Sequence, residues 1–284
     1  MKKIVIIGCK GMAGHVIKNY LESQECYNIW GIARGIESGK KLINLDVTDT
    51  KKIENIFIKE SFDVVINCIG LLNDTAEANP ELAIWYNSYF PHLLASYGKK
   101  YNFKLVHIST DCVFSGKNGN YNEKSFKDGE GFYAQSKSLG EVISSEHITI
   151  RTSIIGPELK QNGIGLFHWF MNQQKSLMGF TKAIWSGVTT LELAKATKWS
   201  IENNIDGLYH ITNNSSISKY DLLSLFKKYT RKNIIINKIC GKTVNKNFID
   251  TRKLINYEIP SYDQMIKDMV KYIHENKNTY SQYL

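Results

Sequence analysis

The sequence predicts an α/β fold in which a doubly wound parallel sheet carries helices on both faces and a smaller C-terminal lobe follows. Short runs of β-branched residues alternate with longer amphipathic stretches up to about residue 155. Val64-Val65-Ile66 is apolar without alternation, as in a strand buried on both faces. Beyond residue 155 this rhythm loosens, which indicates a second lobe.

The predicted strands of the sheet are β-branched runs bounded by turn residues: Lys3–Ile7, Asn28–Ile32, Leu42–Leu45, Asp63–Asn67, Lys104–Ile108 and Ile148–Arg151. The predicted helices between them carry apolar residues at helical spacing: Met12–Ser23, Thr50–Lys59, Pro80–Tyr101 and Tyr133–Ser145. Asp49 is a suitable N-cap for the second helix, and Pro80 suits the first turn of the third.

The C-terminal part predicts four further helices and one strand: Leu166–Lys175, Leu191–Asn203, Lys219–Lys228, Asp263–His274 and the strand Gly207–Ile211. Ser218 and Asp221 resemble a capping box at the start of the third of these helices. Because the strand is expected to return to the sheet, we predict two partly interleaved lobes. One covers residues 1–155 with later segments around 185–212, and the other covers mainly 156–284.

The composition is that of an ordinary globular protein, with 43% hydrophobic and 22% charged residues among 284. A net charge of +9 is compatible with nucleic acid, a membrane surface or small anions as partners. The lysines are spread in ones and twos, however, without a basic block or an aromatic-basic platform, so we expect a solvated surface that binds neither nucleic acid nor membrane.

The sequence carries neither a targeting signal nor a metal-binding pattern. The apolar run after Met1-Lys2-Lys3 stops at Gly8, too early for a signal peptide, and no segment approaches a membrane span. We therefore expect a cytoplasmic protein. The five cysteines are scattered and lack Cys-x-x-Cys spacing, which indicates neither a disulfide framework nor a zinc site, and no metal is predicted.

A glycine-rich turn follows the first predicted strand and leads directly into the first helix. Its residues are Gly8-Cys9-Lys10-Gly11-Met12-Ala13-Gly14. Glycine allows a tight turn and a close approach of the backbone to a pyrophosphate, whose charge the helix N-terminus favours. The glycines could also serve only turning and packing, but their position favours dinucleotide binding. We therefore predict a Rossmann-type domain whose cofactor contacts include Gly8, Gly11, Met12 and Gly14.

The ends of the second and third strands carry further candidate cofactor residues. Arg34 stands where an NAD-selective site commonly has an acid. A guanidinium suits a 2′-phosphate, so we expect NADPH, with NADH as the alternative; Arg34 could equally be a surface charge. Asp46 and Val47 could meet the adenine, or Asp46 or Asp49 could instead cap the next helix.

The fourth and fifth strands end at the same edge of the sheet. Cys68, Ile69 and Gly70 close the fourth strand, and Gly70 would let a cofactor ribose approach the backbone. Ser109-Thr110-Asp111 closes the fifth strand. A hydroxyl there could hydrogen-bond a substrate carbonyl, although these residue types are also common in turns.

Tyr133 and Lys137 lie four residues apart and share one face of the predicted helix. An ammonium beside a phenol can lower the pKa of the phenol and make it a usable proton donor. A lone Tyr-x-x-x-Lys is usually a solvated helix face. The glycine turn and the strand ends before it give this pair a functional setting, namely reduction of a ketone.

At these positions the chain resembles the extended short-chain dehydrogenase/reductase family that acts on nucleotide sugars, in its dTDP-4-dehydrorhamnose reductase-like branch. The matching segments are Gly8–Gly14, Asn67–Gly70, His107–Phe114, Tyr133–Glu141 and Arg151–Ser153. The resemblance implies a catalytic triad of Thr110, Tyr133 and Lys137, of which Tyr133 and Lys137 also contact the cofactor. It implies a nucleotide-linked 4-keto-6-deoxyhexose as substrate in polysaccharide precursor synthesis, and homodimers are frequent in the family.

Three departures from that branch bear on the substrate. Cys112 stands where such reductases often carry tyrosine, Ala134 replaces a glycine, and Ile154 replaces an aromatic residue. The segments Ser109–Phe114 and Arg151–Gly156 look more like relatives that reduce UDP-linked 4-keto sugars with a 2-acetamido group. The base, the C2 substituent, the C4 stereochemistry and the oligomeric state stay open.

Candidate substrate contacts come from both lobes. Asp111, Val113 and Phe114 are expected beside the sugar. Trp185 could stack on the base and Lys182 could face the diphosphate, although a tryptophan in such a place is more often core.

Two other functions stay in view. A 4-epimerase or 4,6-dehydratase would keep NAD bound, but dehydratases typically place glutamate directly after the Thr-Asp pair, where this chain has Cys112. A non-catalytic dinucleotide-binding regulatory subunit would be marked by loss of the active Tyr or Lys, and both are present.

Overall fold

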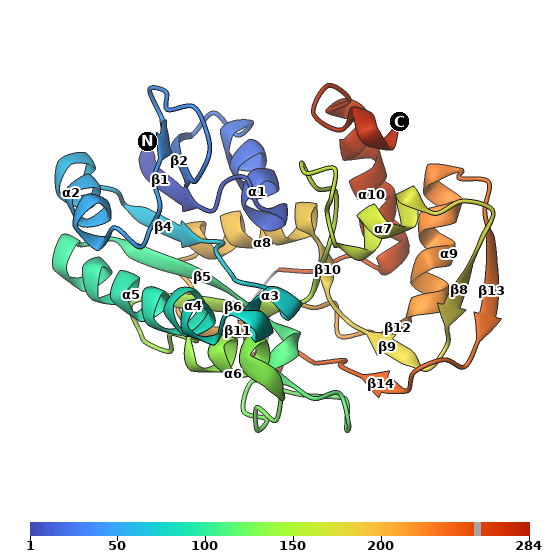
Figure 1. Ribbon diagram of the computed structural model, residues 1–284. Helices are drawn as coiled ribbons and strands as arrows, with labels where there is room; N and C mark the ends of the chain where they lie inside the picture. Colours follow the sequence, from blue (N-terminus) through green and yellow to red (C-terminus); the bar gives the residue numbers. More distant parts are fainter. Residues whose placement is uncertain (253–256) are drawn as a thin grey trace.

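The computed structural model describes residues 1–252 and 257–284 (Figure 1). In this part of the chain the central sheet has seven strands in the order β11-β6-β5-β4-β1-β2-β3, and each neighbouring pair is parallel. The strands are β1 (Lys2–Ile7), β2 (Tyr27–Ala33), β3 (Leu42–Asn44), β4 (Val64–Asn67), β5 (Lys104–Thr110), β6 (Ile148–Thr152) and β11 (Gly207–His210). The predicted doubly wound parallel sheet is confirmed, and its order reverses between β1 and β4, where such folds bind ligands.

Helices cover both faces of the sheet. On one face α1 (Met12–Glu22) packs against α8 (Thr190–Glu202), and on the other lie α2 (Thr50–Glu60) and α5 (Phe90–Tyr101). Alternate residues of β1 point to opposite faces, so Ile6 joins the core under α1 and Val5 joins the core under α2 and α5. Both are fully buried, which explains the unbroken apolar runs of these strands.

The predicted helix over Pro80–Tyr101 is interrupted by a π-helical segment. It consists of α4 (Pro80–Ala83), η1 (Ile84–Tyr89) and α5, and the Phe90 N–H bonds to the Trp85 carbonyl five residues back. Pro91 follows at once and has no N–H to offer the Asn87 carbonyl. That carbonyl instead faces Gly140, where a Cβ would lie 1.7 Å away.

The contact between η1 and Gly140 also marks the end of the next helix. α6 (Gly131–Leu139) packs against η1 and stops at Gly140, whereas the sequence predicted a helix to Ser145. Three shorter helical segments complete this part of the chain and its C-terminus: α3 (Asn73–Ala78), η2 (Asp111–Val113) and η3 (Ser281–Tyr283).

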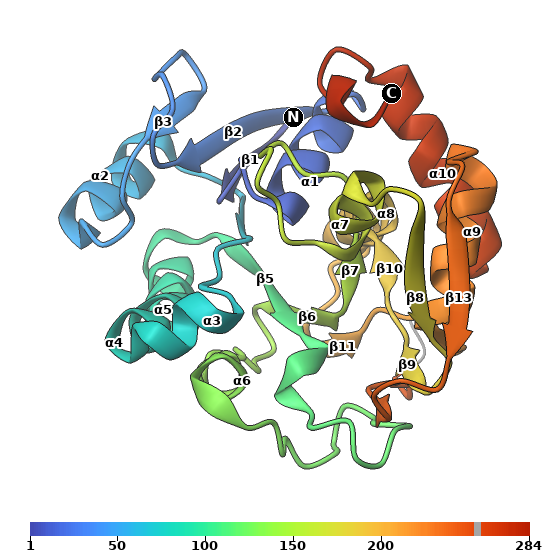
Figure 2. The ribbon, with the colours of Figure 1, turned by 45° about the vertical axis from the view of Figure 1, so that its right-hand side comes forward.

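The C-terminal part gathers on one side of the sheet (Figure 2). Its helices are α7 (Leu166–Asn172), α9 (Lys219–Thr230) and α10 (Tyr262–Glu275). Its short strands are β7 (Ile154–Ile155) with β10 (Val188–Thr189), β8 (Ser176–Phe180) with β13 (Ile235–Ile239), and β9 (Ala183–Trp185) with β12 (Ile217–Ser218) and β14 (Val244–Asn245). The sequence predicted none of these short strands, because runs of two to five residues show too little alternation of apolar and polar side chains.

The predicted capping box at α9 is confirmed. The Ser218 hydroxyl accepts from the Asp221 N–H at 3.1 Å and donates to the Asp221 carboxylate at 2.6 Å.

The chain also returns to the sheet as predicted, since β11 pairs with β6 and α8 lies against α1. The predicted division into a cofactor-binding domain, residues 1–155 with segments around 185–212, and a mainly substrate-binding lobe, residues 156–284, stays a prediction. Among the described residues, no helix is long and apolar enough to cross a membrane.

Candidate active site

The turn between β1 and α1 forms one side of a cavity of about 280 Å³, called here the cofactor cavity. Gly8 has a φ of +85°, and a Cβ on Gly14 would lie 2.2 Å from the Gly8 carbonyl oxygen, so both positions require glycine. The cofactor cavity is also lined by Gly11, Ile69 and Gly70. A backbone cradle without side chains at the start of a helix fits the pyrophosphate of a dinucleotide.

Arg34 reaches the cofactor cavity from the end of β2. Its guanidinium forms an ion pair with Asp46 at 3.2 Å, and its side chain stays 65% exposed. Val47 is buried and also lines this cavity. The exposed guanidinium is therefore within reach of a group bound beside Val47.

Asp46 is held by local bonds. Its carboxylate accepts from the N–H of Thr48 at 3.0 Å and from the hydroxyl of Thr48 at 2.9 Å. Burial raises the pKa of Asp46, but the bonds from Thr48 and Arg34 outweigh it and hold that pKa below its ordinary value. Asp49, not Asp46, caps α2 by accepting from the Lys52 N–H at 3.1 Å, so the cap reading is wrong for Asp46. Its contact with an adenosine stays a prediction.

A second cavity of about 350 Å³, called here the catalytic cavity, adjoins the first and shares Gly11, Ile69 and Gly70 with it. Its lining brings together most of the predicted site residues of the first lobe: Met12, Cys68, Thr110, Asp111, Tyr133 and Lys137. They come from α1, the ends of β4 and β5, and α6. The three residues of the implied triad thus share one cavity beside the glycine turn.

Tyr133 and Lys137 lie on successive turns of α6. The Lys137 ammonium donates to the Ile108 carbonyl at 2.8 Å, and burial lowers the pKa of Lys137 to about 8, against the opposing charges of Glu141 and Cys68. Lys137 is therefore tied to the β5 backbone and stays mainly charged at neutral pH.

The pKa of Tyr133 differs from the sequence expectation. Burial raises the pKa of this phenol, the charges of Cys112 and Asp111 raise it further, and a hydrogen bond with Thr110 opposes them. The expected lowering by Lys137 is not found: burial is the largest cause of the shift, and Lys137 is not among the groups that change the pKa of Tyr133. At neutral pH the phenol keeps its proton, which is the state that a proton donor needs.

The end of β5 supplies the hydroxyl at this edge. Thr110 Oγ1 donates to the Asp111 carboxylate at 3.2 Å and accepts from the Cys112 N–H at 3.2 Å. Ser109 donates its hydroxyl to Glu141 at 2.8 Å instead. Burial raises the pKa of Asp111, and the charges of Lys246 and Lys219 oppose this rise. Thr110 is thus the hydroxyl available beside Tyr133.

The sequence reasoning missed a buried ion pair behind the site. Arg151 donates to both carboxylate oxygens of Glu141, at 2.7 and 2.6 Å. Their side chains are 1% and 0% exposed. Burial raises the pKa of Glu141, but Arg151 and Lys127 outweigh it and hold the pKa below its ordinary value. Both residues lay in segments that carry the family resemblance, but ten residues of separation give no signal of pairing.

A second missed residue holds the start of α6. The Glu77 carboxylate of α3 accepts from the backbone N–H groups of Phe132 and Tyr133, each at 3.1 Å. A carboxylate is favoured at a helix N-terminus, where N–H groups lack partners. Glu77 therefore fixes the turn that carries Tyr133, although it lies 56 residues away in sequence.

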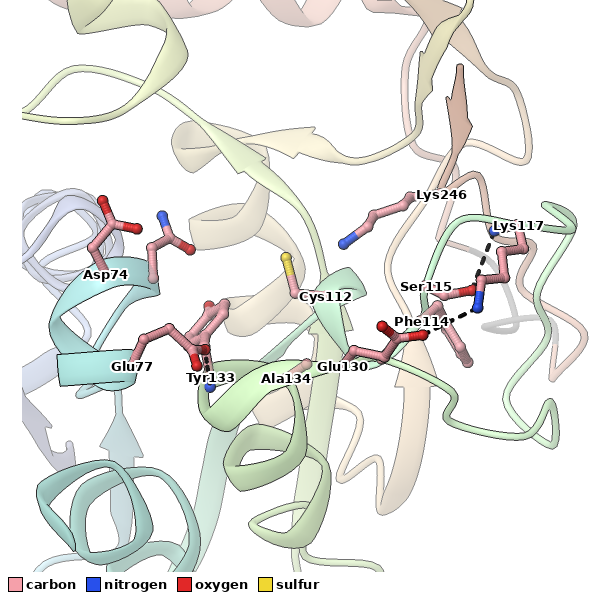
Figure 3. Close-up of a pocket in the computed structure, with 12 residues that line it drawn as sticks. Asp74, Glu77, Cys112, Phe114, Ser115, Lys117, Glu130, Tyr133, Ala134 and Lys246 are labelled. Carbon is pink, nitrogen blue, oxygen red and sulfur yellow. Dashed lines mark hydrogen bonds and ion pairs between the residues drawn. The ribbon is translucent and has the colours of Figure 1, made fainter. Parts of the chain in front are cut away.

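A third cavity of about 410 Å³, called here the outer cavity, extends the site past Tyr133 (Figure 3). It shares Asn73, Cys112 and Tyr133 with the catalytic cavity and is also lined by Phe114 and Lys246.

The two predicted sugar contacts after Cys112 are both fully buried, and they differ in whether they line a cavity. A contact of Phe114 with a sugar stays a prediction. Phe114 lines the outer cavity and stacks on Tyr121 with ring centroids 4.2 Å apart. Val113 is fully buried in a small core cluster with Tyr121 and Phe248 and lines neither substrate-side cavity, so its predicted contact is not supported.

Trp185 and Lys182 also lie apart from the three cavities named here. Trp185 is 4% exposed, donates its indole N–H to Ser153 at 2.8 Å and packs against Tyr262. Lys182 is exposed in the turn between β8 and β9. Their predicted stacking and diphosphate contacts are not supported, because one side chain is core and the other is exposed in a turn that lines none of these cavities.

Comparison with known proteins relates this geometry to a family. A family model described as RmlD substrate binding domain matches residues 1–243. The chain is 26% identical over 227 residues to the spore coat polysaccharide biosynthesis protein SpsK of Bacillus subtilis, covering 78% of this chain and 77% of SpsK. It is 24% identical over 251 residues to a dTDP-4-dehydrorhamnose reductase of Aggregatibacter actinomycetemcomitans, covering 84% and 82% of the two chains.

A solved structure extends the comparison to the fold. The crystal structure of dTDP-4-dehydrorhamnose reductase from Bacillus anthracis in complex with NADP matches with a TM-score of 0.81 at 21% identity, covering 96% of this chain and 99% of that one. The resemblance that the sequence motifs implied is confirmed. The chain belongs to the RmlD substrate-binding domain family and is an oxidoreductase of the extended short-chain dehydrogenase/reductase type.

Proposed function

We propose that the protein reduces the 4-keto group of a nucleotide-linked 4-keto-6-deoxyhexose, with NADPH as hydride donor, in polysaccharide precursor synthesis. The observation that carries this proposal is the catalytic cavity, in which Thr110, Tyr133 and Lys137 meet beside the glycine turn. The names of two relatives, which refer to dTDP-4-dehydrorhamnose reduction and polysaccharide biosynthesis, support the substrate class.

In the proposed mechanism Tyr133 gives its proton to the ketone oxygen. Thr110 turns its hydroxyl from Asp111 to the same oxygen and orients the carbonyl. Lys137, charged below about pH 8, stabilises the phenolate that remains on Tyr133. When bound, the nicotinamide supplies the hydride for the ketone carbon. Glu77 and Glu141 act only by holding α6 and its C-terminal exit in place.

The preference for NADPH rests on Arg34. Its exposed guanidinium lines the cofactor cavity and suits a 2′-phosphate. Asp46 already neutralises part of that charge, so NADH stays the alternative. The solved relative with bound NADP supports a nicotinamide dinucleotide of this kind.

Cys112 argues against the dehydratase alternative. Burial raises the pKa of its thiol to about 11, so it is a poor acid for expelling water at neutral pH. The presence of Tyr133 and Lys137 in one cavity argues against a purely regulatory subunit.

A UDP-linked 2-acetamido sugar as the substrate stays a finer proposal that rests on Cys112 and Ile154. A cytoplasmic location and a homodimer also stay predictions.

The test is turnover with NADPH and a panel of dTDP- and UDP-linked 4-keto sugars, followed by absorbance. We expect Tyr133→Phe to lose about a hundred- to ten-thousandfold in rate while NADPH affinity is kept, because the variant lacks only the acidic proton. Tyr89→Phe, at an exposed position of η1, is the matched control and should retain full activity. Full turnover by Tyr133→Phe with bound NADPH would sink the mechanism.

A further inference from the structure

Two lysines of the C-terminal part converge on the substrate side of the site. Lys246 follows β14 and lines the outer cavity, and its ammonium group points toward Cys112 in Figure 3. Lys219 begins α9, and its Nζ lies 5.7 Å from the centre of the Trp185 ring. The Trp185 indole is bonded to Ser153, which lines the catalytic cavity. Lys246 therefore reaches the site from this lobe, opposite Tyr133. Lys219 lies behind it beside Trp185 and lines none of the three cavities, but its charge acts on Asp111 of the catalytic cavity.

The charges around these lysines do not balance. Within residues 1–252 and 257–284, no ion pair includes Lys219 or Lys246. Both act electrostatically on one carboxylate, that of Asp111. Burial lowers the pKa of Lys219, which shows that its charge is kept at a cost of lost solvation. The outer cavity also holds three carboxylates. Glu130 pairs with Lys117, Glu77 accepts from the start of α6, and Asp74 lies across the cavity from Lys246 (Figure 3). Around Lys219 and Lys246 themselves, two partly buried cations face one carboxylate, which leaves positive charge for a further anion.

The cavities indicate which part of a substrate meets this charge. The catalytic and outer cavities share Cys112 and Tyr133. A sugar whose ketone lies at Tyr133 must extend the rest of the molecule along this shared opening, and Lys246 lines its outer end. The next anionic group of a nucleotide sugar is its diphosphate.

We propose that Lys246 contacts the diphosphate of the substrate, that Lys219 adds its charge from behind, and that the two thereby take the role that the sequence assigned to Lys182. This inference rests on the proposed function, because it takes the substrate to be a nucleotide sugar. Ammonium groups are compact point charges that suit phosphate oxygens. Lys182 has the same charge but stands in an exposed turn away from both cavities, so it offers a matched control.

The test is calorimetric titration of the full-length protein with UDP, dTDP, inorganic pyrophosphate and the uncharged nucleosides uridine and thymidine. We expect Lys219→Gln and Lys246→Gln each to weaken UDP or dTDP about tenfold or more, because each removes a charge that faces phosphate. Nucleoside and NADPH affinities should stay unchanged, and NADPH binding also reports that the variants are folded. Lys182→Gln should bind every probe as the wild type does, and Lys246→Arg should retain most of the diphosphate affinity.

Several results would overturn the assignment. One is unchanged UDP and dTDP affinity in both glutamine variants, and another is no binding of either diphosphate by the wild type. A third is weaker binding of a 4-keto sugar nucleotide alone, with UDP and dTDP unchanged, since this would put the lysines at the sugar. If Lys219→Gln does not fold, Lys246→Gln decides alone, because the Lys246 side chain is only partly buried; unchanged UDP and dTDP affinity in that variant contradicts the assignment.

Failure of the proposed function gives a different pattern. If no sugar of the panel is reduced while diphosphate affinity still depends on Lys219 and Lys246, the binding site stands and the reaction is wrong. If the panel is reduced while the glutamine variants bind diphosphates normally, the reaction stands and the binding site is wrong.

Discussion

Removing the charge of Glu141 should destabilise the whole protein, because it leaves Arg151 buried without a counter-ion. Both side chains are almost wholly shielded from solvent, at 0% and 1% exposed. In Glu141→Gln an amide NH₂ must replace one of the two oxygens that now accept from Arg151 at 2.7 and 2.6 Å. One guanidinium N–H then faces another hydrogen-bond donor and loses its acceptor. Breaking a buried pair in this way costs about 3–5 kcal/mol, a large part of the roughly 5–15 kcal/mol that stabilises a folded domain.

Urea unfolding at pH 7, followed by tryptophan fluorescence, measures this loss. The control is Glu22→Gln, which removes a surface ion pair between Lys18 and Glu22; the Glu22 side chain is 43% exposed. This substitution should lower the free energy of unfolding by less than about 1 kcal/mol. In the double variant Glu141→Leu with Arg151→Met both charges are gone, so we expect a loss well below the sum of the single losses.

The pH dependence gives a second signature of the same pair. The folded-state pKa of Glu141 is held below its ordinary value of 4.5. Its stabilising contribution is therefore fully present above the unfolded pKa and is lost as pH falls through the folded pKa. Glu141→Gln should lose less stability between neutral and acidic pH than the wild type does. A Glu141→Gln protein within about 1 kcal/mol of wild-type stability, or a double variant that loses the full sum, would show that Arg151 does not depend on Glu141 as its counter-ion.

Three further predictions concern the cofactor and the proton. Gly14→Ala should weaken NADPH binding severely in a fluorescence titration, because its Cβ would lie 2.2 Å from the Gly8 carbonyl oxygen. An affinity equal to that of the wild type would contradict binding of the cofactor pyrophosphate by this glycine turn. The kcat/KM for ketone reduction should fall above about pH 8, where Lys137 loses its charge, and a profile flat to pH 10 in Lys137-containing enzyme would contradict this. Arg34→Gln should lower the ratio of NADPH to NADH affinity about tenfold or more, and an unchanged ratio would remove Arg34 from the cofactor site.

The sequence was most informative where chain order fixes position. The carboxyl ends of parallel strands meet at one edge, so the glycine turn, Gly70 and Thr110 could be predicted to lie together without any knowledge of side-chain geometry. Tyr133 and Lys137 joined them because a helix brings residues four apart onto one face. The resemblance to a family then implied their roles, which stay predictions until they are tested.

The sequence was least informative where tertiary contacts decide. Glu77 meets the first turn of α6 only because α3 lies against it, and no local pattern marks such a contact. Trp185 looked suited to stacking, but the direction of a side chain in a three-residue strand depends on its neighbours. The direction of the pKa shift of Tyr133 was also missed, because the spacing of two residues says nothing about burial.

The most direct test of the proposed ketone reduction is to follow the transferred hydride. The protein is incubated with NADPH deuterated at the transferable position and with the reactive 4-keto sugar nucleotide, and the product is examined by NMR and mass spectrometry. We expect one deuterium at C4 of the sugar for each NADPH oxidised, with the rate reduced about a hundredfold or more in Tyr133→Phe. A product formed without deuterium at C4, or formed while NADPH is not consumed, would contradict it.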